Sequence, residues 1–198
     1  MNLYKRILAA TDGIDGWCNP DKQLTLANLV LAVRPSNIVE IGVWGGKSLF
    51  PMAITCDHLK SGHCYAIDPW TADSSVQGQE GEDAKWWGDQ AKHDIVFKRF
   101  SENITRLNLH NWISVERVSS GRANVPESIG LLHLDGNHGP QALLDIQRFG
   151  PSIRSGGVCV LDDLGWTGGA VGQASEWLIA NGFIELHKLG TGACYLKL

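Results

Sequence analysis

Apolar runs and segments of helical periodicity alternate along most of the chain. Five short runs have the length and apolar content of buried strands: residues 37–42, 63–68, 112–118, 129–136 and 156–163. Patterns typical of helices precede and separate them, at residues 3–10, 20–33, 47–59, 90–107, 140–149 and 171–180. Because strands alternate with helices, we expect a parallel sheet covered by helices on both faces.

Proline and glycine mark several boundaries of these elements. Pro35 ends the second helix, and Pro140 stands in the first turn of a later one, where its missing N–H does no harm. The chain closes with residues 183–189 and 192–198, two strands joined by a tight glycine-containing connection. The pattern predicts one α/β domain that takes in the whole chain. It has a helical segment at residues 1–34, and a seven-stranded, mostly parallel sheet ending in an antiparallel hairpin.

The periodic pattern fails between residues 70 and 90, where polar residues and glycines are mixed with Trp86 and Trp87. Long irregular segments in small domains are usually functional, so we expect a lid or acceptor-binding loop here. Trp86, Trp87 and Trp166 are weak candidates for an acceptor pocket, because aromatic walls suit planar or sugar substrates. Packing of a lid helix onto the domain explains these tryptophans equally well.

Composition narrows the class of protein. Hydrophobic residues make up 43% of the 198 residues and charged residues 19%, a balance typical of a soluble globular domain. The net charge of -4 gives no basic excess for nucleic acid, and no apolar run is long enough to span a membrane. The five cysteines are odd in number and lack C-x-x-C spacing, which argues against disulfides or a zinc cluster and for the cytoplasm. We also expect no signal peptide.

Residues 38–50 contain Gly-Lys-Ser, the ending of a phosphate-binding P-loop. That loop requires a glycine where the chain has Ile41. The dinucleotide pattern G-x-G-x-x-G, counted from Gly42, would require glycines in place of Trp44 and Lys47. Neither nucleotide-binding pattern is therefore present.

Polar residues gather where the predicted strands end. They are Glu40, Asp68, Ser119, Ser120, Asp135, Asp162 and Asp163. Ligands of open parallel sheets bind outside the carboxyl ends of the strands, so this edge is the expected ligand site. Asp68 follows the glycine loop at about the 20-residue spacing of a ribose-binding carboxylate, although it could also start a turn before a proline.

The glycine loop favours a ligand with a positive group. Glu40 would repel a pyrophosphate but suits an amino acid joined to a nucleoside. Gly42 and Gly46 would let the backbone approach such a ligand, and Ser48 could bond its carboxylate. The alternative is a structural turn with Lys47 exposed.

The stretch "EIGVWGGKS" resembles motif I of class I S-adenosylmethionine-dependent methyltransferases, and "YAIDPW" resembles their acidic ribose-binding motif. Residues 131–166 resemble the metal-dependent O-methyltransferases of natural-product (macrolide and sugar) pathways and, more distantly, catechol O-methyltransferase. The resemblance implies a Rossmann-like sheet. It also implies roles for individual residues. Glu40, Gly42 and Ser48 would bind the methionine part of the cofactor, Asp68 its ribose, and Ser119 and Ser120 would lie beside its adenine. Asp135, Asp162 and Asp163 would hold a divalent ion, usually magnesium, and His138 would be the catalytic base.

These roles predict a Mg²⁺-dependent O-methyltransferase acting on a small hydroxylated acceptor, with Asp135 or His138 as the general base. Carboxylates are the ligands that Mg²⁺ prefers, and an ordinary histidine accepts a proton at neutral pH. Asn137 departs from the family pattern, because many relatives carry a second carboxylate there. His133 lies inside an apolar strand and is expected to be a core residue. The alternatives are a metal-independent methyltransferase, an NAD-linked oxidoreductase and a non-catalytic binding module. A homo-oligomer is possible in each case.

Overall fold

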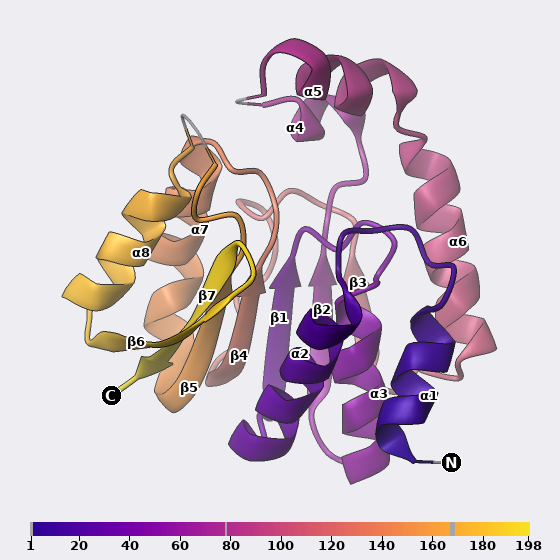
Figure 1. Cartoon of the computed structure of the whole chain (residues 1–198), viewed down its shortest axis with the longest axis vertical. Coiled ribbons are helices and arrows are strands. Elements are labelled where there is room, and N and C mark those ends of the chain that lie inside the picture. Colours follow the sequence, from indigo (N-terminus) through magenta and orange to yellow (C-terminus); the bar gives the residue numbers. More distant parts are fainter. Residues whose placement is uncertain (1, 78, 167–168) are drawn as a thin grey trace.

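The computed structural model describes residues 2–77, 79–166 and 169–198. The strands are β1 (Asn37–Ile41), β2 (His63–Ile67), β3 (Ile113–Glu116), β4 (Ile129–Leu134), β5 (Ile153–Leu161), β6 (Phe183–Leu189) and β7 (Gly192–Lys197). They form one sheet in the order β3-β2-β1-β4-β5-β7-β6 (Figure 1). Strands β1 to β5 pair in parallel, whereas β7 is antiparallel to both of its neighbours. The predicted parallel sheet with a closing hairpin is confirmed.

Helices cover both faces of this sheet. The longer ones are α1 (Leu3–Thr11), α2 (Pro20–Val33), α3 (Leu49–Leu59), α6 (His93–Arg106), α7 (Pro140–Phe149) and α8 (Val171–Ala180). Side chains of α1, α2, α3 and α6 share one buried apolar cluster with the sheet, and side chains of α7 and α8 share a second. The sheet therefore lies between two hydrophobic layers, as the apolar character of its strands requires.

The segment predicted to be irregular holds short helices: α4 (Ala72–Ser75), α5 (Gly81–Lys85) and a π-helical turn, η1 (Trp86–Gln90). We call these three elements the cap. In Figure 1, α4 and α5 lie beyond the arrowheads of the parallel strands, at the top of the view. Elements of four or five residues leave no periodic signal in a sequence, which is why the pattern missed them. A 3₁₀ turn, η2 (Gly150–Ser152), joins α7 to β5.

Other boundaries differ from the prediction by a few residues. Helix α3 begins at Leu49 rather than residue 47, because Lys47 and Ser48 form a turn after Gly46. Helix α6 begins at His93 rather than residue 90, because the π-helical turn of the cap occupies the residues before it. Strand β5 begins at Ile153, before the glycine pair at which the apolar run starts.

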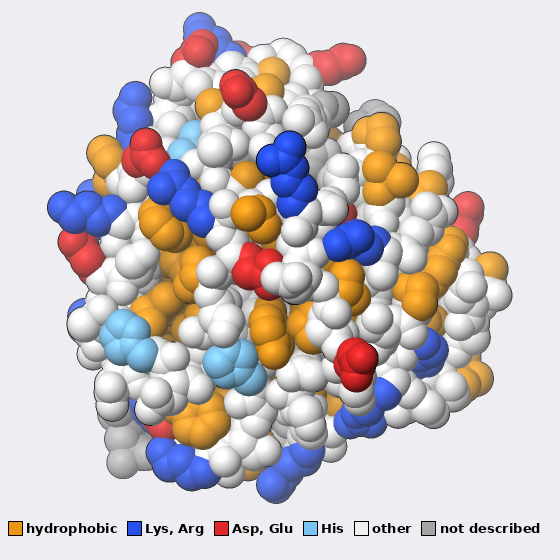
Figure 2. All heavy atoms as spheres, turned by 180° about the vertical axis from the view of Figure 1, so that it is seen from behind, with side chains coloured by type: hydrophobic (Ala, Val, Ile, Leu, Met, Phe, Trp, Pro, Cys, Tyr) orange, Lys and Arg blue, Asp and Glu red, His pale blue; other side chains and the backbone are white. Residues whose placement is uncertain are grey.

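The surface carries mixed charge. Figure 2 shows the molecule from behind, where Lys and Arg side chains are interspersed with Asp and Glu instead of gathering into one basic stripe. Within residues 2–77, 79–166 and 169–198, no helix has the length and apolarity needed to cross a bilayer. All five cysteines are buried and free, as expected from their spacing.

Candidate functional site

The glycine loop between β1 and α3 is held by the carboxylate of Asp68, at the end of β2. Its Oδ2 accepts hydrogen bonds from the backbone N–H groups of Val43 and Trp44, each at 3.0 Å, and Oδ1 accepts one from Trp70 at 2.6 Å. Burial raises the pKa of Asp68, while these three N–H groups act in the opposite direction. Two carboxylate oxygens offer about four acceptor positions, so one remains for a ribose hydroxyl. Ribose binding by Asp68 remains a prediction.

Gly42 and Gly46 are needed for packing. Both have left-handed backbone, with φ of 85° and 84°. A Cβ on Gly42 would overlap the carbonyl oxygen of Asp135, and one on Gly46 would lie 2.8 Å from the rings of Phe50 and Phe100. We expected these glycines to admit a ligand, but the space they leave is taken by the protein itself. Their part in cofactor binding remains a prediction.

Glu40 is fully buried at the end of β1 and is shared by two partners. The hydroxyl of Ser48 and the Nδ1 atom of His133, at 2.8 Å, both contact its Oε1 atom. Ser48 was expected to bond a ligand carboxylate, but its hydroxyl donates a hydrogen bond to the Glu40 carboxylate. Oε2 of Glu40 has no hydrogen-bond partner among the described residues. This oxygen is the one left to face a positive group.

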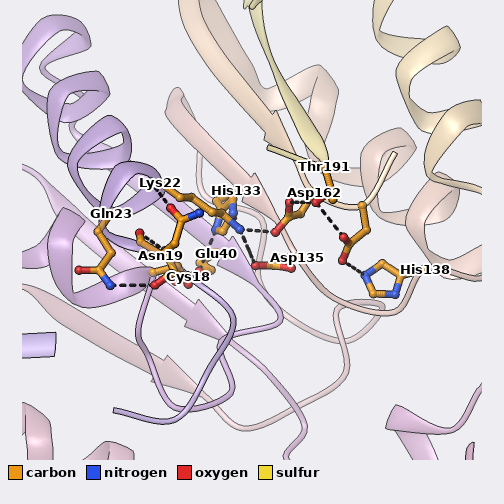
Figure 3. A network of polar contacts seen from close by, with 12 residues as sticks. Cys18, Asn19, Lys22, Gln23, Glu40, His133, Asp135, His138, Asp162 and Thr191 are labelled. Carbon is orange, nitrogen blue, oxygen red and sulfur yellow. Dashed lines mark hydrogen bonds and ion pairs between the residues drawn. The ribbon is translucent and has the colours of Figure 1, made fainter. Parts of the chain in front are cut away.

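A lysine that the sequence did not single out lies at the centre of the acidic site (Figure 3). The Nζ atom of Lys22, in the first turn of α2, is 3.0 Å from Oδ2 of Asp135 and donates a second hydrogen bond to Oδ2 of Asp162. Its side chain is only 8% exposed. Lysine is almost never buried unless it is paired, and a lysine in a helical pattern is normally solvated, so the sequence carries no signal that marks Lys22.

The charges in this group shift one another's pKa values. Burial alone would lower the pKa of Lys22, but the charges of Asp135 and Asp162 outweigh burial and hold that pKa above its ordinary value. Burial raises the pKa of Asp135 to about 6, against the opposing charges of Lys22 and His133. Burial also acts to raise the pKa of Asp162, yet its pairing with Lys22 keeps that pKa below the usual value. Lys22 therefore stays protonated.

The beginning of α2 fixes where Lys22 can reach. The side chain of Asn19 caps the helix by accepting the backbone N–H of Lys22 at 2.9 Å, and a proline opens the first turn. Gln23 donates to the carbonyl of Cys18 at 2.8 Å and contacts the hydroxyl of Thr11 at 2.7 Å. These contacts tie the helix start to the loop before it, so the lysine is delivered from a rigid element.

His138 and Asp163 form a second pair beside this site, on loops after β4 and β5. Nε2 of His138 lies 3.0 Å from Oδ2 of Asp163, and the His138 ring stacks on Trp166 with centroids 4.6 Å apart. The contact with His138 is the main reason that the pKa of Asp163 lies below its ordinary value. Thr191, in the closing hairpin, donates to Oδ1 of Asp163 at 3.0 Å and of Asp162 at 3.3 Å. Neither ring nitrogen of His138 has a partner in hydrogen-bond geometry among the described residues, so the contact with Asp163 is a close charge contact.

The predicted acidic set is therefore brought together at one edge of the sheet. Two groups of side chains place possible metal-ligand atoms within 4.8 Å of one another: His133, Asp135 and Asp162, and Asp135, His138 and Asp163. The ammonium group of Lys22 sits on the two carboxylates of the first group. His133, predicted to be a core residue, is fully buried, and its Nε2 lies 3.8 Å from Oδ2 of Asp135.

The tryptophans divide between two places. Trp86 and Trp87 of the cap pack with Trp17 and Trp44, with ring centroids 4.8 to 6.4 Å apart. A cavity of about 380 Å³ opens beside this cluster, between the loop preceding α2, the π-helical turn and α6. Trp166 stands apart, on His138. The three predicted pocket residues therefore do not line a single pocket. Trp86 and Trp87 form a cluster with Trp17 and Trp44, which the sequence did not single out.

Ser119 and Ser120 follow β3. The carbonyl of Ser119 accepts a backbone hydrogen bond from Arg122 at 2.9 Å, and the hydroxyl of Ser120 accepts one from Gln141 of α7 at 3.3 Å. Ser120 is buried against that helix. Their predicted place beside an adenine ring remains untested.

Comparisons with known proteins bear on the family and the fold. Residues 39–164 match a family model described as "Methyltransferase domain", which spans the sheet from β1 to the end of β5. No match was found among curated protein sequences.

Solved structures share the fold over nearly the whole chain. The O-methyltransferase TomG from Streptomyces achromogenes, involved in tomaymycin synthesis and solved with SAM, has a TM-score of 0.66 at 14% identity, covering 100% of this chain and 90% of its own. The O-methyltransferase NovP has a TM-score of 0.70 at 15% identity, and the match covers 90% of this chain and 80% of NovP. An O-methyltransferase from Bacillus cereus, solved with SAH, has a TM-score of 0.64 at 17% identity, and the match covers 98% of this chain and 90% of that enzyme. At these identities the likeness shows the fold.

Proposed function

The chain belongs to the methyltransferase-domain family, and on this premise we propose that it is an S-adenosylmethionine-dependent O-methyltransferase acting on a hydroxyl group of a small sugar or natural-product acceptor. One observation carries the reaction type. Nε2 of His138 lies 3.0 Å from a carboxylate oxygen of Asp163, and neither ring nitrogen makes an aligned hydrogen bond within the described residues, at the edge of the sheet where ligands of this fold bind. Family membership also disfavours the NAD-linked oxidoreductase.

The cofactor would lie over the glycine loop. Oε2 of Glu40 is a buried carboxylate oxygen without a protein partner, and the amino group of a methionine moiety would satisfy it. Asp68 keeps one acceptor position for a ribose hydroxyl and holds the loop in shape by its other contacts. Ser119 and Ser120 would edge the adenine. Bound S-adenosylmethionine supplies an activated methyl group on a sulfonium centre.

His138 would act as the general base. The nearby carboxylate of Asp163 would favour a proton on Nε2, which would leave the lone pair of Nδ1 to take the proton of the acceptor hydroxyl. Bound S-adenosylmethionine would supply the methyl group to the oxygen that loses this proton, and the electron pair of its carbon–sulfur bond would stay on sulfur. Asp163 would stabilise the imidazolium so formed. Most of the remaining rate enhancement would come from alignment of oxygen, carbon and sulfur.

A magnesium ion was expected on Asp135, Asp162 and Asp163. The arrangement does not fit an ion on the first two, because the ammonium group of Lys22 already takes an oxygen of each. The remaining group contains His138, a poorer partner than oxygen for Mg²⁺. This observation favours the metal-independent methyltransferase, so no step is assigned to a metal.

Calorimetric titration of S-adenosylmethionine and S-adenosylhomocysteine tests the cofactor. We expect both to bind and NADH not to bind. Incubation with S-adenosylmethionine and a panel of sugars, phenols and polyketide alcohols, read by mass spectrometry, tests the reaction. We expect a methyl ether product; methylation of nitrogen or carbon acceptors alone, or no cofactor binding, contradicts the proposal.

A further inference from the structure

We propose that Lys22 is the resident cation of the acidic site. Its ammonium group occupies the place of a divalent metal ion between Asp135 and Asp162 and keeps such an ion out. The inference rests on the proposed function only for its catalytic meaning, namely that methyl transfer here proceeds without a metal. The occupancy itself is a property of three side chains and can be measured without any activity.

The contacts of Lys22 meet the demands of a cation in this position. The ammonium group contacts Oδ2 of Asp135 and Oδ2 of Asp162, which belong to two neighbouring strand ends (Figure 3). Both aspartates also belong to the first of the two groups able to ligate a metal. A divalent ion that bound these oxygens at about 2 Å would lie close to the ammonium charge, which would repel it. Lysine and metal therefore compete for the same place.

The charge balance of the surroundings supports the same assignment. Three carboxylates, those of Glu40, Asp135 and Asp162, lie within one connected network, and His133 joins the first two. Buried carboxylates are stable only when they are paired or bound to a metal. Lys22 is the lysine that pairs Asp135 and Asp162 among the described residues, and its side chain is too buried to be a surface charge that happens to lean inward.

Lys22 is also unable to withdraw easily. The cap by Asn19 and the contact of Gln23 with the preceding loop fix the first turn of α2. Moving the ammonium group outward would leave both carboxylates, whose side chains are 25% and 11% exposed, without this counter-charge. We therefore regard the lysine as a permanent part of the site and not as a placeholder that an ion displaces.

The test is a titration of the full chain with Mn²⁺, in which electron paramagnetic resonance measures the concentration of free ion. The variants are Lys22→Met, which keeps the length and removes the charge, and Lys5→Met, which removes an exposed lysine from the neighbouring helix α1. We expect the wild-type chain and Lys5→Met to bind no Mn²⁺ at the acidic site. Lys22→Met should gain one site, at least about tenfold tighter than any site in the wild type.

Two further measurements complete the test. Adding Asp162→Asn to Lys22→Met should abolish the gained site, which locates it. Millimolar Mg²⁺ should raise the melting temperature of Lys22→Met but not of the wild type or Lys5→Met, because a ligand stabilises only the form that binds it.

Three results would overturn the proposal. They are tight Mn²⁺ binding by the wild type that Asp162→Asn removes, no gained site in a folded Lys22→Met, and a gained site that survives Asp162→Asn. Should Lys22→Met not fold, the wild-type titration alone decides, since the proposal requires that it show no ion at this site. Titration of S-adenosylmethionine into the same samples reports separately on the proposed function, so the two can fail independently.

Discussion

Nε2 of His138 lies 3.0 Å from Oδ2 of Asp163, across two loops that follow adjacent parallel strands. Asp163 reaches this position with a left-handed backbone, φ of 50°, a conformation that aspartate tolerates better than most residues. The pair is held from the opposite side by Thr191 of the closing hairpin. Three separate parts of the chain thus orient one imidazole ring.

Replacing His138 by Gln should lower kcat by roughly 10²–10⁴-fold, because the base that accepts the hydroxyl proton is lost. The affinity for S-adenosylmethionine should change little, since the residue contacts the acceptor side. Asp163→Asn should lower kcat less, through the loss of the carboxylate on Nε2. Steady-state kinetics and calorimetry check both. His58→Gln, on the exposed side of α3, is the matched control and should behave as wild type. Unchanged kcat in His138→Gln would remove this residue from the mechanism.

Stability should depend on pH through Asp135. Its pKa is about 6 in the folded chain against an ordinary 3.8, so the folded state holds the proton more tightly than the unfolded state. The stability from this group is fully present below pH 3.8 and is lost as the pH rises through 6. Relative to Asp135→Asn, the wild type should therefore lose at most roughly 3 kcal/mol between pH 4 and pH 7.

Urea unfolding at the two pH values measures this difference. Asp163→Asn serves as a control of opposite sign, because the folded pKa of Asp163 is lowered and its contribution is lost as the pH falls. Equal pH slopes for the wild type and Asp135→Asn would contradict the assignment.

Gly42→Ala should destabilise the fold strongly. The residue has φ of 85°, and a Cβ would overlap the Asp135 carbonyl at the end of β4. Left-handed strain of about 1–2 kcal/mol adds to about 1–3 kcal/mol for the overlap. Gly13→Ala is the matched control: it has φ of 69° with nothing within 4 Å of the added atom, so only the strain applies. Thermal or urea unfolding should separate the two; equal losses would show that the contact between strand ends carries no cost.

Asp68→Ala should weaken both the fold and the cofactor site. It leaves the backbone N–H groups of Val43, Trp44 and Trp70 without their acceptor, which costs about 1–3 kcal/mol for each group that water cannot reach. Because the glycine loop loses its anchor, the dissociation constant for S-adenosylmethionine should rise. Calorimetry and unfolding check the two effects, with Asp73→Ala on the exposed side of α4 as control. Unaltered cofactor affinity would mean that the loop holds its shape without Asp68.

The tryptophan cluster gives a prediction about the acceptor. Trp17 is 70% exposed yet packs on Trp44, Trp86 and Trp87. If the adjacent cavity receives the acceptor, Trp17→Ala should raise the acceptor KM about tenfold, the loss of one aromatic contact, with cofactor affinity unchanged. Trp166→Ala tests the alternative position of the acceptor, beside His138, because the Trp166 ring stacks on that residue. An effect confined to Trp166→Ala would move the acceptor to the His138 side.

The sequence was sufficient for the sheet and for much of the site, for identifiable reasons. The strand with residues 129–134 reads as a continuous apolar run because both of its faces are buried, and α7 is marked by the proline in its first turn. Asp135, Asp162 and Asp163 could be placed together because parallel strands end at one edge.

Lys22 could not be found in the same way. It stands 113 residues from Asp135, and a lysine in a helical pattern is normally a solvated residue. The hydrogen bond from Ser48 to Glu40 was hidden for a similar reason, since the pattern reports the helix start but not where the hydroxyl turns. Side-chain pairing across elements depends on tertiary geometry, which a periodic pattern does not encode.

The distance along the chain between Lys22 and its partners has a consequence for synthesis. The lysine leaves the ribosome 113 residues before Asp135 and 140 residues before Asp162. Contacts of such separation form late, because the intervening chain must first be ordered. We expect α2 to pack stably on the sheet only once β5 has joined it. Packing of the amino-terminal helices would therefore be completed only after the last third of the chain has been synthesised.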